Sequence, residues 1–523
     1  MAPTYLSPGV YVEEVDGGSK PIAGVGTAVA AFVGLAKQGP VNTATLVTNW
    51  TQFVEGFGDF MEGSFLAHAV YGYFNNGGGR CYIVRVGASE DGTGDDTPNA
   101  VAALPAASNT DLNTLAITLL GPGEAAADIS VEIADPTPEE GSEPNLELFN
   151  LTVQRGGQAV ETFENLSLGR GRNVRNVVTV VNAESQVIRV AVLETPGDLS
   201  LAERRPRTGS FGLVVPEASP SAVTELAPKD FEGDAAQRSG MGGLEAADDI
   251  TMLCAPDLMS AYQSGLIDLE GLQAVQTAMI NHCERMGDRV AILDAPPGMK
   301  PQEIENWRVN IANYDSSYAA LYYPWVKVFD PVAGKSMLVP PSGHVAGIWA
   351  RNDSTRGVHK APANEVVGGA IDVEFQITKG EQDGLNPAGI NCIRAFPGRG
   401  IRVWGARTLT SDPAWRYLNV RRLFNMVEKS IDNGTQWVVF EPNDFALWQR
   451  INRGVTAFLN TVWRSGALFG ATPSDAFYVK CDEETNPPEN RDLGMVTVEI
   501  GIAPVKPAEF VIFRISQWSP EEA

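Results

Sequence analysis

The chain has 523 residues, of which 44% are hydrophobic and 20% are charged. At about 100–200 residues per domain, this length predicts three or four domains, and the ordinary apolar fraction excludes wholesale disorder. Asp and Glu (64) outnumber Lys and Arg (39), and the net charge of -25 disfavours nucleic acid and anionic lipid as partners, because the summed field repels both.

Cysteine, histidine and hydropathy patterns exclude further classes. The five cysteines form no Cys-x-x-Cys pair and the four histidines are dispersed, so we expect free thiols in a reducing compartment and no metal site. Residues 1–8 lack the basic and apolar regions of a signal peptide. The longest apolar stretch, residues 24–36, is shorter than the about 20 residues that span a bilayer. These patterns predict a soluble, cytosolic chain without direct membrane insertion.

The first predicted element is an extended strand at residues 9–15, which follows a proline and has nothing local to pair with. The composition then changes after Arg85. Residues 91–250 contain 26 acidic and 10 basic residues and neither Tyr nor Trp. We interpret this stretch as a separate, solvent-facing insertion. Alternating runs between Gly, Pro and Asp clusters predict a small antiparallel β domain there, with strands at residues 115–120, 129–133, 146–153 and 187–193.

From about residue 244 the pattern becomes α/β. Residues 250–255 and 289–294 are short, nearly continuous apolar runs, typical of strands buried on both faces. Between them, residues 269–286 have helical spacing, and a strand–helix–strand unit predicts a parallel sheet. Residues 318–329 are predicted to add another strand.

Two amphipathic helices are predicted next. The first begins with Asp412 as N-cap and Pro413 at the first helical position. Its apolar stripe comprises Tyr417, Val420, Phe424, Val427 and Ile431. The second begins near Asn443, and the face opposite its apolar stripe carries Arg450, Arg453 and Arg464. The stripes predict core packing, whereas the basic faces are either solvated or in contact with an acidic partner.

The C-terminal part contains two extended segments, residues 495–502 and 510–518. Like residues 9–15, they have no evident local partner. A terminal strand with spare backbone donors is suited to extending the sheet of another subunit, and pairing within the same chain is the alternative.

No motif for catalysis or cofactor binding is found. The glycine-rich turn at residues 75–80 lacks the ending of a phosphate loop, and residues 398–405 space their glycines wrongly for a dinucleotide site. Asp294 and His344 would begin an Asp–His–Ser series, but no suitable serine follows, and Ser342 is expected to have no helix after it to supply an oxyanion site. We expect no catalytic residue, no cofactor, no metal and no enzymatic activity.

Many short segments nevertheless form a recognisable series, from YLSPGVYVEE at residues 5–14 to GIRVWGARTL at residues 400–409. The others are residues 23–36, 53–58, 75–86, 255–257, 292–297, 322–325, 339–351, 357–364, 385–387, 415–422, 440–443 and 503–510. In this order they resemble the tail sheath proteins of contractile phages and of phage-tail-like contractile injection systems. The resemblance covers nearly the whole chain except about residues 91–240.

The resemblance implies a multidomain α/β and α+β fold. Its parts are a subtilisin-like α/β middle domain without a catalytic triad, a β-rich inserted outer domain, and an α+β C-terminal assembly domain with exchanged terminal strands. The expected boundaries are 1–22 (N-terminal arm), 23–90 (N-terminal part of the core), 91–243 (acidic outer domain), 244–400 (subtilisin-like domain), 401–502 (assembly domain) and 503–523 (C-terminal arm).

The resemblance also implies a function. Subunits of this family form stacked hexameric rings around an inner tube and contract from a metastable extended state, which drives the tube through a target envelope. Arm exchange implies intersubunit roles for Val10, Tyr11, Val12, Val15, Phe510, Val511, Ile512, Phe513 and Ile515. The basic helix faces are candidate inner-tube contacts, through Arg421, Arg422, Arg450, Arg453 and Arg464, and solvated surface or intrachain salt bridges are the alternatives for these arginines.

The expected partners are other copies of the chain, the inner tube, and baseplate and terminal cap proteins. Residues 16–19 and 503–507 are expected to act as hinges between arms and body. Assembly is expected in the bacterial cytoplasm, and the final site is a phage tail, a released particle or an intracellular injection apparatus. A shell polymer without contraction and a subtilisin-like hydrolase are the alternative functions.

Overall fold

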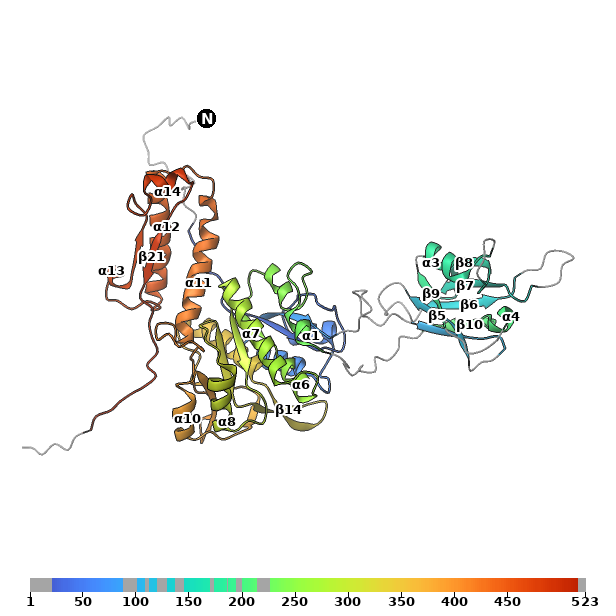
Figure 1. The fold of residues 1–523 in the computed structure, drawn as a ribbon, viewed down its shortest axis with the longest axis horizontal. Coiled ribbons are helices and arrows are strands. Elements are labelled where there is room, and N and C mark those ends of the chain that lie inside the picture. The colour runs from blue at the N-terminus through green and yellow to red at the C-terminus, as the bar shows by residue number, and fades with distance from the viewer. Residues whose placement is uncertain are drawn as a thin grey trace, which may run out of the picture. The chain divides into compact units, whose positions relative to one another are not determined.

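The chain divides into two compact units (Figure 1). The computed structural model describes residues 21–87, 101–108, 112–119, 129–136, 145–169, 174–185, 187–193, 200–213 and 226–515. The first unit comprises Met1–Ala36, Asn42–Gly87 and Glu225–Ala523, and the second comprises Lys37–Val41 and Ala88–Thr224. The predicted strand at residues 9–15 lies outside the described residues, and with it Val10, Tyr11, Val12 and Val15.

A nine-stranded sheet forms the centre of the first unit. Six neighbouring strands, from β18 to β3, are parallel, and the strands beyond them are antiparallel. The spatial order is β16 (Glu365–Val366), β19 (Gly400–Val403), β18 (Ile390–Phe396), β13 (Ala319–Tyr323), β12 (Val290–Asp294), β11 (Met252–Cys254), β1 (Val29–Gly34), β3 (Arg80–Arg85) and β2 (Thr45–Val47). Every residue of β1, β12 and β13 is buried. For β12, this confirms the strand buried on both faces that the apolar run at residues 289–294 predicts.

Helices pack on this sheet in two groups. α2 (Leu66–Asn75) and α9 (Ser342–Arg356) contact each other and the central strands, and so do α6 (Asp257–Gln263) and α7 (Leu269–Met286). The predicted helix at residues 269–286 is confirmed as α7. The shorter helices are α1 (Trp50–Phe57), α5 (Pro228–Glu232), η2 (Gly242–Ala246), α8 (Pro301–Asn306), η3 (Trp307–Ala312) and α10 (Lys379–Leu385).

Two expectations for this region need correction. The single strand predicted over residues 318–329 is broken after Tyr323, and β14 (Val326–Asp330) leaves the central sheet to form a separate three-stranded sheet with β15 (Lys335–Val339) and β17 (Ala370–Val373). The expected domain boundary at residue 400 cuts β19, although that strand pairs with β18 and therefore belongs to the central sheet.

A helical hairpin and a small sheet follow. α11 (Leu418–Thr435) leads through η4 (Gln436–Val438) to α12 (Phe445–Arg464) (Figure 1). α13 (Pro473–Ala476), β20 (Phe477–Lys480), α14 (Pro488–Asp492) and β21 (Glu499–Ile502) complete it. β20 and β21 pair antiparallel, and their apolar residues join the helices in one core. For residues 495–502 the alternative of pairing within the same chain is therefore confirmed, because β20 pairs with residues 499–502.

The start of α11 also differs from the prediction. Asp412 accepts the backbone N–H of Ala414 over 2.8 Å and so closes a turn, while the helix begins six residues later, with Tyr417 at its N-cap position. The N-cap motif identified in the sequence is thus used one turn upstream of the helix. α12 starts close to the predicted place, and its N-cap Asp444 accepts the N–H of Leu447.

The second unit contains two antiparallel sheets that share one hydrophobic core. One sheet has the order β10 (Gly209–Gly212), β6 (Ile129–Ala134), β7 (Phe149–Arg155) and β8 (Gln158–Leu166), and the other β4 (Val101–Pro105), β5 (Asn113–Leu119) and β9 (Ile188–Val192). α3 (Val177–Glu184) and α4 (Leu201–Arg204) complete the unit. It ends at Thr224, before the expected boundary at residue 243, because fully buried Phe231 and its helix α5 belong to the first unit and pack on α7.

In the part of the chain that the structure describes, no helix is both long enough and apolar enough to cross a membrane.

Candidate functional site

The carboxyl edge of a parallel sheet is where α/β enzymes usually bind ligands, and here two buried aspartates occupy it. The carboxylate of Asp257, after β11, accepts the N–H groups of Leu35 (2.6 Å) and Phe65 and the hydroxyl of Ser64 (3.0 Å). Burial raises the pKa of Asp257 to about 6 against the effect of these hydrogen bonds. The carboxylate therefore joins loops of the protein to one another.

Asp294, at the end of β12, has a comparable role. Its carboxylate accepts the backbone N–H of Ser342 over 2.8 Å, and burial raises its pKa to about 7. Contrary to the expectation from sequence, a helix does follow Ser342, namely α9. His344 nevertheless lies against Gly72 of α2, where burial lowers its pKa to about 4. Asp294 thus binds the start of α9, and His344 packs between helices.

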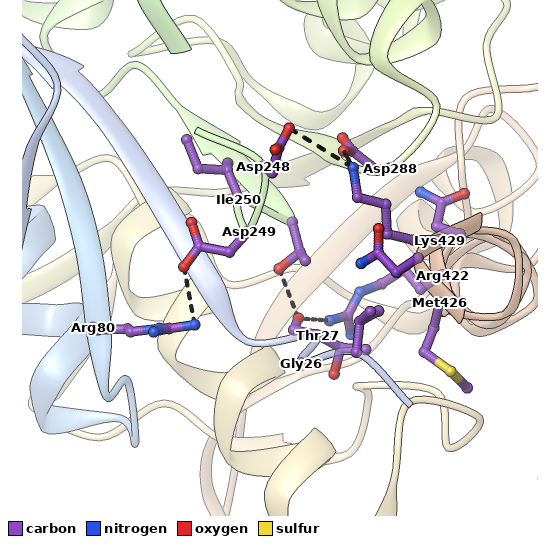
Figure 2. Close-up of a pocket in the computed structure, with 14 residues that line it drawn as sticks. Gly26, Thr27, Arg80, Asp248, Asp249, Ile250, Asp288, Arg422, Met426 and Lys429 are labelled. Carbon is purple, nitrogen blue, oxygen red and sulfur yellow. Dashed lines mark hydrogen bonds and ion pairs between the residues drawn. The ribbon is translucent and has the colours of Figure 1, made fainter. Parts of the chain in front are cut away.

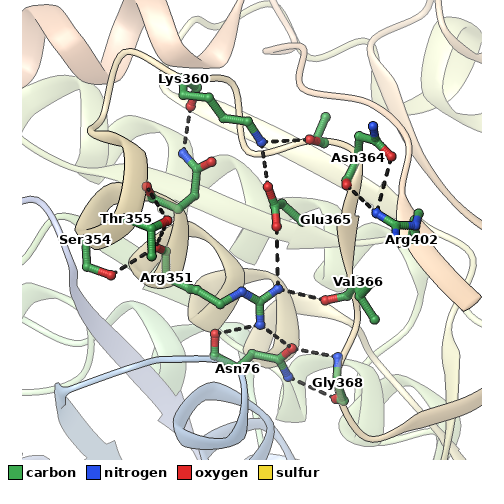
Figure 3. Close-up of polar contacts among 12 residues, drawn as sticks. Asn76, Arg351, Ser354, Thr355, Lys360, Asn364, Glu365, Val366, Gly368 and Arg402 are labelled. Carbon is green, nitrogen blue, oxygen red and sulfur yellow. Dashed lines mark hydrogen bonds and ion pairs between the residues drawn. The ribbon is translucent and has the colours of Figure 1, made fainter. Parts of the chain in front are cut away.

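The glycine-rich turn at residues 75–80 also has an internal structural role (Figure 3). The side-chain amide of Asn76 donates to the carbonyls of Gly72 and Gly368, and its oxygen accepts the N–H of Gly368 over 2.7 Å. Arg351 of α9 binds the carbonyls of Asn76 and Val366. This network fixes the turn to α9 and to the segment that carries β16.

Of the predicted C-terminal strand at residues 510–518, residues 516–518 lie outside the described residues, and residues 510–515 do not form a strand within the chain. Residues 511–515 have no regular secondary structure. The apolar side chains of this run, with exposed fractions between 68% and 94%, are Phe510, Val511, Ile512, Phe513 and Ile515. An exposed apolar run of this size is unusual for a chain that acts alone. Below, the "apolar arm" means residues 510–515.

Immediately before the apolar arm, Glu509 is held by four hydrogen bonds. Arg407 donates to both carboxylate oxygens, at 2.9 and 2.7 Å, while Asn386 and Tyr417 donate at 2.8 and 3.2 Å. Burial acts to raise the pKa of Glu509, but the hydrogen bonds from Arg407 and Asn386 outweigh it and lower the pKa. Sequence reasoning missed this clamp, because Glu509 is about 100 residues away from its three partners and the four residues belong to no motif.

The segment before Glu509 is also attached to the body. Val505 donates its N–H to the carbonyl of Ala467 and accepts the side-chain amide of Asn419, and the N–H of Phe469 donates to Ala503. Residues 503–507, which were expected to act as a hinge, are therefore hydrogen-bonded to α11 and to the segment after α12. From Phe510 to Ile515 every residue is exposed.

The five candidate arginines fall into two groups. Arg421 and Arg422 are 5% and 4% exposed and are therefore interior residues, in line with the alternative of intrachain salt bridges. Arg422 forms a bidentate ion pair with Asp353 of α9, at 3.0 and 2.6 Å. Arg421 stacks on Trp415, with 4.3 Å between guanidinium and ring centroid. α11 is therefore buried on its basic side as well, against the central domain.

On α12 the arginines lie at the surface. Arg453 and Arg464 are exposed. Arg450 is half-buried, where it stacks over Trp437 at 4.3 Å from the ring centroid and pairs with Glu441 at 3.3 Å. The structure thus leaves Arg453 and Arg464 as the accessible charges of the predicted basic face.

A cavity of about 170 Å³ lies where residues 25–27, the sheet and α11 meet (Figure 2). Its charged lining is already paired within the chain, since Arg80 binds Asp249 at 2.9 Å and Lys429 binds Asp288 at 3.2 Å. Arg422 reaches its floor and donates to the carbonyl of Thr27 over 2.9 Å. This arrangement joins the chain before β1 to α11.

Comparison with protein-family models identifies two matches. The phage tail sheath protein central domain matches residues 249–409, and the phage tail sheath C-terminal domain matches residues 410–517. Together these two matches span more than half of the chain.

Individual relatives agree with these matches. The tail sheath protein of Burkholderia phage BcepMu is 25% identical over 98% of this chain and 97% of its own length. A prophage major tail sheath protein of Pseudomonas aeruginosa is 26% identical over 68% of this chain and 99% of its own length. The match to the tail sheath protein of a Vibrio phage, 24% identical over 55% of this chain, spans 46% of that protein.

Solved structures resemble the chain along nearly its whole length. The helical sheath of the anti-feeding prophage in its contracted state has a TM-score of 0.58 at 24% identity and covers 98% of this chain and 100% of that one. The contracted sheath complex of an extracellular contractile injection system, PVC, has a TM-score of 0.55 at 22% identity, with 98% of each chain covered. These likenesses establish a mixed α/β multidomain fold of the sheath type.

Proposed function

Because this chain belongs to the contractile tail sheath family and is a sheath subunit, we propose that it polymerises as stacked hexameric rings around an inner tube. The polymer assembles in a metastable extended state, and its contraction drives the tube through a target envelope. Baseplate and terminal cap proteins bind its two ends. The central domain, in this proposal, is a subtilisin-like scaffold without catalytic function, and assembly takes place in the bacterial cytoplasm.

The observation that carries this proposal is the exposed apolar arm. A chain that functions alone gains nothing from five exposed apolar side chains within six residues, whereas a polymer subunit buries them in a neighbour. The sheet of β20 and β21 supplies the acceptor, since a two-stranded sheet has outer edges that can each accept a further strand. We propose that the arms at residues 9–15 and 510–515 extend this sheet in neighbouring subunits.

The free energy of burying an arm and the entropy cost of ordering it together set how tightly the arm binds. Full burial of five apolar side chains contributes about 8–15 kcal/mol, while ordering six residues costs roughly 6–12 kcal/mol of backbone entropy. The two quantities nearly cancel, so that one arm binds weakly by itself. Strand hydrogen bonds and the simultaneous attachment of several arms then decide whether rings hold together, which favours cooperative polymers over dimers.

We further propose that the α12 face containing Arg453 and Arg464, with Arg450 at its margin, contacts the inner tube. Exposed charges form weak, salt-sensitive contacts, which suits an interface that must release the tube on firing. Arg421 and Arg422 are left out of this contact because the protein interior already binds them.

Electron microscopy of the purified chain, alone and co-expressed with its tube protein, tests the proposal. The full-length chain is expected to form hollow helical tubes, and the chain without residues 1–20 none. Phe513→Ser with Ile515→Ser is expected to abolish tubes, whereas the matched control Arg514→Ser in the same segment preserves them. Tubes of wild-type length from the Phe513/Ile515 variant would overturn arm exchange, and discrete particles under every condition would overturn the sheath function.

A further inference from the structure

α11 contacts both terminal segments: Glu509, just before the apolar arm, is bound at its N-cap, and residues 22–27 run along the helix from Ile22 beside Gly434 to Thr27 beside Arg422. Tyr417, the N-cap residue, donates its hydroxyl to Glu509, and Arg422, in the second turn, binds the carbonyl of Thr27. These two helix residues are only five positions apart. α11 therefore contacts the C-terminal root (Glu509) at its N-cap and the N-terminal root (residues 25–27) further along the helix.

The N-terminal root is a buried ion pair with a third member. Arg422 and Asp353 are 3% and 4% exposed in their side chains, and the hydroxyl of Thr27 donates to the same carboxylate over 2.6 Å. Further along α11, the N–H of Val25 donates to the hydroxyl of Ser430 over 3.0 Å. Residues 25–27 are thus tied to α11 and to the end of α9 together.

The C-terminal root has the same design. Arg407, which follows β19, and Glu509 form the ion pair. The third member is Tyr417, the N-cap residue of α11. In the N-terminal root the ion pair joins the central domain to α11, and the hydroxyl of Thr27 comes from the terminal segment. In the C-terminal root the ion pair joins the central domain to the terminal segment, and the hydroxyl of Tyr417 comes from the start of α11. The two roots were assembled from four separate regions of the sequence, and no motif connects them.

We propose that α11 is the common anchor of both arms: the Arg407–Glu509–Tyr417 cluster fixes the C-terminal root to its N-cap, and the Arg422–Asp353–Thr27 cluster fixes the N-terminal root to its second turn. Tension on either arm then passes to α11 and to the central sheet. This inference rests on the proposed exchange of arms between subunits. In a contracting polymer the arms keep neighbours connected while the bodies move, and a connection of this kind needs a root that does not peel away under tension.

Ion pairs suit this task better than apolar contacts do. Replacing a buried ion pair by apolar residues is often neutral for overall stability, whereas removing one partner is strongly unfavourable because the other charge stays buried. A bidentate arginine–carboxylate pair also fixes direction, since both N–H···O bonds must align. The roots are therefore sites of defined geometry, where even a small displacement costs free energy because it misaligns the hydrogen bonds of a buried ion pair.

α11 also provides a matched control for this proposal. Arg421 pairs with Glu428 at 3.2 Å, but Glu428 is 53% exposed in its side chain, and the pair lies within the helix and contacts no arm root. Substituting Glu428→Gln removes one charge from α11 without affecting either root.

Hydrogen exchange of the full-length chain tests the anchor without any polymer. We expect Glu509→Gln to accelerate exchange of residues 503–509 at least tenfold, and Asp353→Asn to do the same for residues 25–28, each leaving the other root unchanged. Thr27→Val, which removes a single donor, gives a smaller effect at residues 25–28 if Asp353→Asn fails to fold. Exchange rates equal to those of Glu428→Gln at both roots would overturn the proposal.

The resistance of assembled sheaths to graded shear then tests the proposed anchor separately from the proposed exchange of arms. Sheaths of Glu509→Gln and Asp353→Asn are expected to break into pieces at least twofold shorter than those of Glu428→Gln. If deleting residues 510–523 abolishes assembly but the two root variants resist shear like the control, arm exchange stands and the anchor is wrong. If that deletion leaves assembly intact, the proposed exchange fails, and the exchange rates of the free chain still decide whether the roots are anchored.

Discussion

α11 and α12 have nearly the same sequence pattern and opposite surroundings. Both are amphipathic helices of 18 and 20 residues with arginines outside the apolar stripe. In α11 the arginines are buried against the central domain, whereas in α12 Arg453 and Arg464 are exposed. An arginine opposite an apolar stripe is therefore either an interior ion-pair partner or a free surface charge, and the difference depends on whether a second layer of protein covers that face.

The largest expected effect is the loss of a buried charge partner. Asp353→Ala is expected to lower the free energy of unfolding by about 3–5 kcal/mol, because Arg422 remains buried and unpaired. Arg453→Ala on the exposed helix is expected to change it by less than about 0.5 kcal/mol. Urea unfolding of both variants measures the contrast, and a cost for Asp353→Ala below about 1 kcal/mol would remove the distinction between the two helices.

The buried carboxylates of Asp257 and Asp294 make the stability of the folded chain depend on pH. With a pKa of about 7 for Asp294 and about 6 for Asp257, the folded chain retains protons that the unfolded chain, with Asp near 3.9, releases. Their stabilising contribution is complete below about pH 4 and is lost as the pH rises to about 7, by on the order of 4 kcal/mol for Asp294.

Unfolding curves between pH 4 and 8 test this dependence. Asp294→Asn is expected to flatten the decrease in stability between pH 5 and 7. The matched control is Asp315→Asn, because hydrogen bonds from Ser411 lower the pKa of that exposed carboxyl, which titrates below this window. An unchanged slope in Asp294→Asn would show that Asp294 stays ionised in the folded chain.

Helix capping gives a smaller contrast between the same two helices. Asp444 caps α12 through the N–H of Leu447 at 2.9 Å, so Asp444→Ala is expected to cost about 1 kcal/mol. Asp412 closes a turn ahead of α11 and caps no helix, so we expect Asp412→Ala to cost less than half of that. Thermal unfolding of the two variants ranks them, and equal costs would mean that the turn at Asp412 stabilises α11 as an N-cap does.

The smallest effect on stability is expected for the exposed arginines, together with the clearest loss of function. Arg453→Glu with Arg464→Glu is expected to leave the free energy of unfolding unchanged within about 0.5 kcal/mol and to abolish co-sedimentation with the inner tube at low salt. Lys379→Glu, on a helix of the central domain, serves as the charge-reversal control. Undiminished tube binding by the double variant would exclude this face as the contact.

Local patterns predicted the elements whose surroundings follow from the sequence itself. Residues 289–294 have to lie in the centre of a sheet, because an uninterrupted apolar run needs cover on both faces, and β12 confirms it. The spacing of α7 together with Asp268 at its N-cap and Gly287 after its end marks both helix limits. By contrast, the start of α11 was misplaced, since Asp412 and Pro413 suit a turn as well as a helix start.

The sequence by itself determined the parallel centre of the fold, the helical hairpin, the acidic insertion and the apolar arm, because each depends on periodicity or composition within a short window. Only the tertiary structure decided that β20 pairs with β21, that Arg421 and Arg422 are interior, and that Glu509 is bound by Arg407, Asn386 and Tyr417. These features join residues tens to hundreds of positions apart, and a buried ion pair has no signature until folding brings its partners together and removes the water around them.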